Sequence, residues 1–144
     1  MKNIFITFLA SLSIFFINAH AANAAQHKIT LKQARALVWA TLSPEVLRLP
    51  GIEILDANKD PENIASYEGT DPRYLNFSVM SNASDGVSYY TVDSYTGDVF
   101  DPTGDCAEHI DKRLMAFQKK VRRSLHLTDT QYRKIKTKGP NCTE

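Results

Sequence analysis

Hydrophobic and polar residues alternate along two neighbouring stretches in the middle of the chain. Within residues 74–80, Leu75, Phe77 and Val79 recur at every second position, a period that predicts a strand with one buried face. Residues 87–93 are rich in β-branched and aromatic side chains, which favour a pleated sheet. The pattern therefore predicts two consecutive strands.

A tight turn follows the second of these strands. The sequence Ser94-Tyr95-Thr96-Gly97 fits a turn that needs a positive φ at its last residue, which glycine adopts without steric cost. Residues 98–100 return as a third strand, and Pro102 ends it because proline cannot donate to the ladder. We expect a three-stranded antiparallel meander, with residues 52–55 as a further strand at its edge.

Helical periodicity appears on both sides of the strands. Thr30 and Gln33 form a capping box ahead of a helix over residues 31–42, and a short helical turn is predicted over residues 46–49. A second capping box at Thr128 and Gln131 begins a last helix that runs through Ile135. The longest helix precedes it, with an apolar stripe suited to lie across a sheet, formed by Ile110, Leu114, Phe117, Val121 and Leu125.

These elements predict an α+β fold: an N-terminal helix, an antiparallel meander of three to four strands, and two C-terminal helices packed on one face. The polar stretch 56–71 is interpreted as a loop, which could carry function or simply tolerate insertion.

The N-terminal 24 residues have the organisation of a secretory signal peptide. Lys2 precedes an apolar run over residues 4–17, and Ala-x-Ala sites place cleavage after Ala21 or Ala24. The alternative is an uncleaved membrane anchor, but the run is shorter than the ~20 residues that a spanning helix needs. We therefore expect a signal peptide at 1–24, a single domain at 25–144, and a periplasmic or secreted location.

The sequence contains two cysteines, Cys106 and Cys142. In an exported protein an even number of cysteines indicates a disulfide bond, and only one intramolecular pairing is possible here.

The hairpin sequence Tyr89-Tyr90-Thr91-Val92-Asp93-Ser94-Tyr95-Thr96-Gly97-Asp98-Val99 resembles the closing hairpin of PepSY-type domains. Those are small secreted or membrane-proximal α+β modules, some of which inhibit peptidases. The resemblance covers about a dozen residues and implies a module that acts on a peptidase or in the assembly of envelope proteins. It implies no catalytic residues.

Charge is divided unevenly along the chain. Residues 25–105 hold six basic and twelve acidic residues, a net charge of −6, whereas residues 106–144 hold ten basic and four acidic residues, a net charge of +6. This division could steer a charged partner or reflect solvated faces. The basic long helix could likewise contact an anionic membrane or nucleic acid, although export argues against nucleic acid.

Catalytic and metal-binding patterns are not recognised in the sequence. His27, His109 and His126 are spaced too far apart to form one site without help, and no hydrolase, zinc or nucleotide motif occurs. Clustered aspartates could bind calcium, but we interpret them as caps of turns and of the following helix: Asp93, Asp98, Asp101 and Asp105. We expect no enzyme, no cofactor and no metal.

Tyrosines gather around the meander, and tyrosine is favoured at protein interfaces. We expect a protein-binding surface on the exposed face of the meander and its loops, formed by Tyr74, Tyr90, Tyr95 and Asp98. The sequence thus favours an inhibitor or immunity protein that blocks a wall-degrading or toxic enzyme. The alternatives are the PepSY-like module and a small hydrolase with an unrecognised site.

Overall fold

The computed structural model describes residues 27–57, 71–103, 106–137 and 139–140, with only the main chain at 84–87. The elements follow the order α1 (Leu31–Thr41), the 3-10 helix η1 (Val46–Arg48), β1 (Glu53–Asp56), β2 (Tyr74–Ser81), β3 (Ser84–Asp93), β4 (Val99–Phe100), α2 (Lys112–Ser124) and α3 (Asp129–Ile135). This confirms the α+β class. The order of helices differs from the outline of one N-terminal and two C-terminal helices only by η1, the helical turn predicted over residues 46–49, which stands between α1 and the sheet.

The predicted signal peptide and most of the predicted loop at 56–71 lie outside the described residues. No helix in the described part of the chain is long and apolar enough to cross a membrane.

Both predicted capping boxes are present. The amide of Gln33 donates to Thr30 Oγ1 (3.2 Å), and the Thr30 amide donates to Gln33 Oε1 (2.8 Å) at the start of α1. Thr128 and Gln131 exchange the same bonds at the start of α3, at 3.3 and 2.9 Å. These bonds satisfy helix amides that have no partner within the helix, so each helix begins where the sequence predicted.

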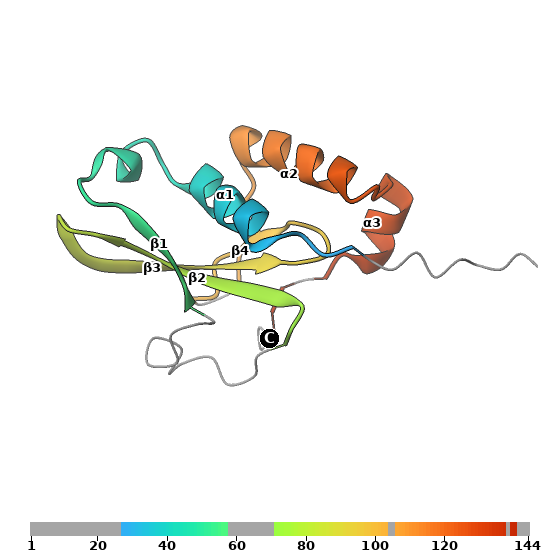
Figure 1. The fold of residues 1–144 in the computed structure, drawn as a ribbon, viewed down its shortest axis with the longest axis horizontal. Coiled ribbons are helices and arrows are strands. Elements are labelled where there is room, and N and C mark those ends of the chain that lie inside the picture. Colours follow the sequence, from blue (N-terminus) through green and yellow to red (C-terminus); the bar gives the residue numbers. More distant parts are fainter. Residues whose placement is uncertain (1–26, 58–70, 104–105, 138, 141–144) are drawn as a thin grey trace, which may run out of the picture.

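The four strands form one antiparallel sheet in the order β1-β2-β3-β4, with β1 at one edge as predicted (Figure 1). The segment after β4 covers the other edge. His109 N–H donates to the carbonyl of Val99 (2.8 Å), and Asp101 N–H donates to that of Ala107 (2.9 Å). Residues 107–109 therefore continue the sheet beyond the two residues of β4.

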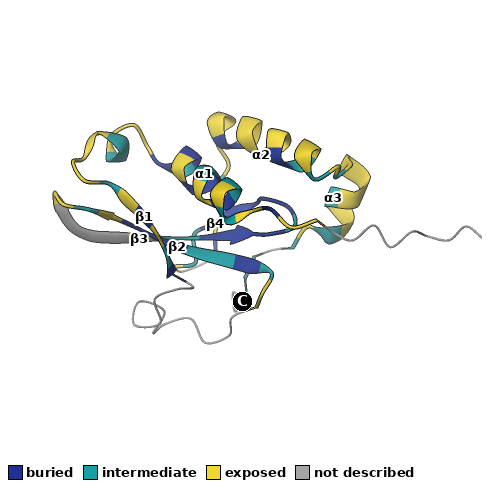
Figure 2. Cartoon of the chain, viewed as in Figure 1, coloured by how far each residue is buried: buried dark blue, intermediate teal, exposed yellow. Residues whose placement is uncertain are grey.

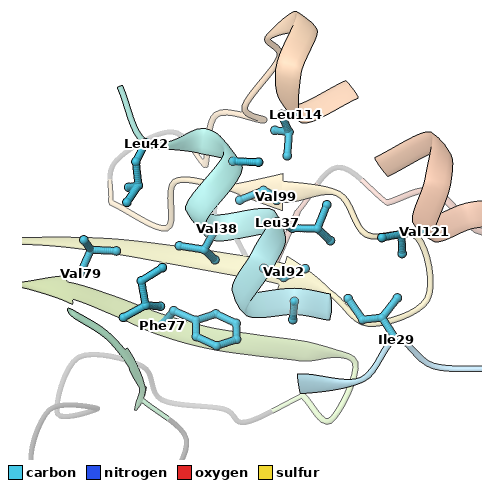
Figure 3. Packing of buried hydrophobic residues seen from close by; sticks show 13 residues of the cluster. Ile29, Leu37, Val38, Leu42, Phe77, Val79, Val92, Val99, Leu114 and Val121 are labelled. Atoms are coloured by element: carbon cyan, nitrogen blue, oxygen red, sulfur yellow. The ribbon is translucent and has the colours of Figure 1, made fainter. Parts of the chain in front are cut away.

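The core lies between α1 and one face of the sheet (Figure 3). Leu37 and Val38 of α1 meet Phe77 of β2 and Val92 of β3, and all four side chains are fully buried. Phe77 and Val92 lie on the same face of the sheet. Val92 is paired with Leu75, and Leu75 and Phe77 are two residues apart on one strand, so their side chains point to the same side. The predicted buried face of β2 is thus confirmed.

Helix α2 lies alongside α1 and antiparallel to it. Arg113 Nε, near the start of α2, donates to the carbonyl of Ala40 (3.0 Å), while Gln33 Nε2 donates to Ser124 Oγ (3.1 Å) at the other end. Figure 2 shows α2 exposed over most of its surface and buried only along a narrow stripe.

The predicted stripe of α2 is partly wrong. Leu114 and Val121 are buried, but Ile110 precedes the helix and is 72% exposed, and Phe117 is 36% exposed. Gln118 is buried in the stripe instead, because its amide donates to the carbonyl of Gly97 (3.1 Å). The helix therefore packs against the β3–β4 turn as well as against α1. At the turn, its buried contact is the hydrogen bond of Gln118 and not an apolar contact.

Candidate functional site

The β3–β4 turn holds two buried carboxylates, those of Asp93 and Asp98, both fully inaccessible to solvent. Gly97 N–H donates to the Asp93 carbonyl (2.8 Å), and Asp93 N–H donates to that of Asp98 (2.9 Å), which closes the turn. Gly97 has the predicted positive φ, +72°. A Cβ added there would lie 3.3 Å from Leu37 Cδ1, so the turn approaches α1 closely.

Asp93 joins the turn to the start of β2 and the end of α3. Its Oδ2 accepts from Arg73 Nη2 (2.6 Å) and Nε (2.9 Å), and its Oδ1 accepts from the amide of Tyr95 (2.9 Å). The same guanidinium donates through Nη2 to the carbonyl of Ile135. One arginine thus satisfies a buried carboxylate and a carbonyl at the C-terminal end of α3.

Asp98 joins the turn to both C-terminal helices. Its Oδ1 accepts from Arg122 Nη2, and its two oxygens lie 3.1 and 3.2 Å from the Tyr132 hydroxyl, which donates. Arg122 Nε donates to the Thr96 carbonyl (2.9 Å), and the guanidinium lies 3.8 Å above the Tyr132 ring. Burial raises the pKa of Asp98, opposed by the charge of Arg122, and burial together with the Asp98 charge raises the pKa of Tyr132.

A cleft of about 500 Å³ opens beside this network, between residues 108–110, α2 and α3. Cations and apolar side chains line it together with two acidic residues. Its charged lining residues are Lys119, Arg122, Arg123, Lys136, Glu108 and Asp129, and its apolar ones include Ile110, Met115 and Leu127.

The cations of the cleft fall into two groups. Arg122 is paired with Asp98, and Lys136 Nζ contacts Glu108 at 2.7 and 3.0 Å. Lys119 and Arg123 are exposed and form no ion pair with any residue that the structure describes. The rim of the cleft thus carries two uncommitted positive charges next to Met115, which is 53% exposed.

His109 lies between this cleft and a smaller pocket of about 160 Å³. Its ring centroid is 5.3 Å from that of Tyr90, and its Nε2 is buried without a hydrogen-bond partner among the described residues. Burial lowers the pKa of His109, although the charges of Asp101 and Asp111 oppose the shift. The neutral imidazole is therefore the form that this position favours.

The four residues predicted to bind a protein do not form one surface. Tyr74 is buried, and its hydroxyl donates to the Gly139 carbonyl (3.0 Å) and lies 2.8 Å from Thr137 Oγ1. Asp98 is buried in its ion pair, so the expected exposure is wrong for both. Tyr90 and Tyr95 are half-buried, Tyr90 against the core cluster and Tyr95 with Lys28 Nζ 5.0 Å above its ring. Whether either binds a partner stays a prediction.

The four aspartates that were considered as calcium ligands do not share one role. Asp93 and Asp101 cap turns as predicted, the latter accepting from the amide of Thr103 (2.8 Å), but the cap of α2 is Asp111. Asp98 forms the buried ion pair instead, and Asp105 lies outside the described residues. In the part of the chain that the structure describes, no group of three or more His, Cys, Asp or Glu could hold a metal ion.

Cys106 is buried, and its Sγ lies 3.7 Å from the carbonyl oxygen of Pro140. Cys142 is two residues further along the chain and lies outside the described residues, so the disulfide stays a prediction. The described geometry brings Pro140, two residues before Cys142 in the sequence, close to the sulfur of Cys106.

The cleft was not predicted from the sequence, although one signal was available. Met115 is apolar, lies off the buried stripe of α2 and has Lys112 and Lys119 three residues before and four residues after it on the helix. An exposed methionine on a basic helix is typical of a contact surface, because its flexible side chain adapts to a partner.

No protein family and no curated protein sequence matches this chain. Its fold is similar to that of a chain in the structure of a type VI secretion system effector-immunity complex from Pseudomonas protegens. The TM-score is 0.55 and the sequence identity 20%, over 76% of this chain and 87% of that chain. At this identity the similarity concerns the fold.

Proposed function

We propose that this protein is an exported inhibitor or immunity protein that binds a toxic or wall-degrading enzyme and blocks it. The observation that carries the proposal is the similarity of the fold to most of one chain of an effector-immunity complex. A partner of this kind fits a small domain that carries an exposed cleft with charged and apolar residues on one side.

The internal charges support binding rather than catalysis. Asp98 and Tyr132, whose pKa values are displaced, bond to each other, and Arg122 pairs with Asp98 and lies over the Tyr132 ring, so that the three residues hold α2 and α3 against the turn. Displaced pKa values often mark catalytic groups, but ion-pair networks inside a fold produce them as well. A rigid framework of this type suits an inhibitor, because a preorganised surface loses little entropy when it binds.

Export and the disulfide belong to the same proposal. A signal peptide at 1–24 would deliver the chain to the periplasm or outside the cell, where Cys106 and Cys142 can be oxidised. An immunity protein in the periplasm meets an incoming enzyme before that enzyme reaches its substrate.

A PepSY-like module that acts on a peptidase is a second candidate. It is favoured by the hairpin on which the resemblance rests, since Asp93, Thr96 and Gly97 form the tight turn that its sequence predicts. The two candidates differ in the class of enzyme that is bound, which one experiment can identify.

The experiment is affinity capture followed by an enzyme assay. The tagged mature chain is exported in its native host, co-purifying proteins of the envelope fraction are identified by mass spectrometry, and the captured enzyme is purified and assayed. We expect one stoichiometric enzyme whose activity falls to background at a 1:1 ratio and whose toxicity is relieved by co-expression. A captured peptidase would favour the PepSY-like module. A captured enzyme that keeps full activity, or no captured enzyme, would contradict the proposal.

A further inference from the structure

We propose that the cleft beside α2 is the docking site for an acidic loop of the target enzyme that inserts one apolar side chain. The site comprises Ile110 and Met115 as apolar contacts and Lys119 and Arg123 as the cations that bind carboxylates. This inference rests on the proposed function and names the surface and the partner chemistry that the function would use.

Charge is the first argument. Helix α2 carries six Lys or Arg and no Asp or Glu, so its cations repel one another. Lys119 and Arg123 are four residues apart and therefore neighbours on one side of the helix, at the rim of the cleft. Neither is paired within the described residues, whereas Arg122 and Lys136 already contact Asp98 and Glu108. A partner with two or more carboxylates relieves this repulsion and is attracted from a distance.

The exposed apolar residues are the second argument. Ile110 is 72% exposed and Met115 is 53% exposed, and both line the cleft. Methionine and arginine are enriched in the cores of protein interfaces, where apolar contact and bidentate hydrogen bonds occur together. Large apolar side chains at the rim of a cleft lose contact with water when a partner side chain enters. The occupant is therefore a protein segment with an apolar residue among its acidic ones.

The acidic residues of the cleft distinguish this partner from a membrane or a nucleic acid. Asp129 also lines the cleft, beside the paired Glu108 and Lys136, so a continuous surface of phosphates would meet the negative charge of Asp129 there. The separate carboxylates of a loop can contact Lys119 and Arg123 and avoid both acids. The structure thus favours a discrete acidic loop.

Side-chain bonds join the walls of the cleft to the rest of the fold. Tyr132 of α3 bonds to Asp98, and Lys136 bonds to Glu108 in the segment opposite, so both walls are tied to the sheet. A volume of about 500 Å³ admits the tip of one loop. The site is therefore ready to receive a loop without rearranging α3.

The test compares three variants of the full chain in the capture experiment. The charge variant is Lys119→Glu with Arg123→Glu, and the apolar variant is Ile110→Ser with Met115→Ser. The matched control is Lys120→Glu with Arg35→Glu, since both residues are exposed and lie outside the cleft lining. Far-UV circular dichroism and thermal melting check that each variant folds. The Kd of each for the captured enzyme is then measured by calorimetry at low and high salt.

We expect the charge and apolar variants each to bind at least about tenfold more weakly, and the control to bind as the wild type does. Added salt should weaken the wild type but not the charge variant. A photo-crosslinker at Met115 should join a segment rich in Asp or Glu, and replacing two of those acids by Lys should restore binding of the charge variant.

Other results separate the two proposals. Equal binding by all variants would overturn the cleft as the docking site and leave the inhibitor function standing. Capture of nothing by the wild type would overturn both. A crosslink to a segment without acidic residues would overturn the acidic loop. Sedimentation of the wild type, but not of the charge variant, with phosphatidylglycerol vesicles would overturn the protein partner in favour of a membrane.

Discussion

The carboxylate of Asp98 and the guanidinium of Arg122 form an ion pair that joins the β3–β4 turn to α2, with the carboxylate fully buried and Arg122 one-fifth exposed. Replacing Arg122 by Ala leaves a buried carboxylate that keeps only neutral side-chain partners, the hydroxyls of Tyr132 and Thr96, among the described residues. We expect R122A to lower the free energy of unfolding by about 3 kcal/mol, measured by urea denaturation. The neighbouring R123A removes an exposed arginine and should change it by less than about 0.5 kcal/mol. Equal effects of the two would contradict the structural role of the pair.

The raised pKa of Asp98 predicts how stability depends on pH. The native state holds the Asp98 proton more tightly than the unfolded state, so this contribution is present below about pH 4 and is lost as the pH rises through the native pKa. Asp98→Asn cannot titrate, so the wild type should lose stability relative to D98N between pH 4 and pH 7. Urea denaturation at each pH measures the difference. The opposite trend would show that Arg122 outweighs burial.

The pKa of His109 is shifted in the opposite direction to that of Asp98, so its contribution to stability depends on pH in the opposite way. Its pKa is lowered by burial, so the stability that it contributes is present above about pH 6.5 and is lost as the pH falls through the native pKa. We expect the wild type to lose stability relative to H109F between pH 7 and pH 5 in denaturation experiments. His27 is exposed, and H27Q is the matched control for replacing a histidine. A parallel pH dependence of wild type and H109F would refute the prediction.

Gln118 is a polar residue in the buried stripe of α2, held by its bond to the Gly97 carbonyl. Gln118→Leu fits the stripe but leaves that carbonyl without its donor, so we expect a loss of about 1–2 kcal/mol in the free energy of unfolding. Lys120→Leu, at an exposed position of the same helix, should have little effect on chemical denaturation. A more stable Q118L would mean that apolar packing outweighs the hydrogen bond.

The predicted disulfide would close a loop of about 35 residues and stabilise the fold by roughly 3–4 kcal/mol. Intact-mass analysis of the oxidised mature protein, alkylated under denaturing conditions, should find no modified cysteine, and two after reduction. Reduction and the double replacement C106S/C142S should lower the midpoint of urea unfolding by the same amount. Alkylation of both cysteines without reductant would contradict the predicted disulfide.

Local signals in the sequence predicted the starts of α1 and α3 and the conformation of Gly97, because these depend on residues at most a few positions apart. The same is true of the alternation in β2. The class of the fold followed from the order of these elements, and η1 was recognised only as a helical turn.

Contacts between distant residues could not be predicted. Tyr74 was expected on the surface because nothing near it in sequence indicates that Thr137 and Gly139 cover its hydroxyl. Asp98 belongs to a turn, where aspartate is ordinarily exposed, and is buried only because Arg122 and Tyr132 reach it. The cleft likewise exists only because residues 108–110, α2 and α3, which are separate along the chain, meet there.

The partners of Asp98 have a consequence for the synthesis of the protein. Arg122 and Tyr132 follow Asp98 by 24 and 34 residues, so the hairpin emerges from the ribosome long before its carboxylate can be neutralised. Until then, burying the turn carries the cost of an unpaired charge, which keeps the sheet from closing around it. The chain therefore completes its fold only after α3 has been made.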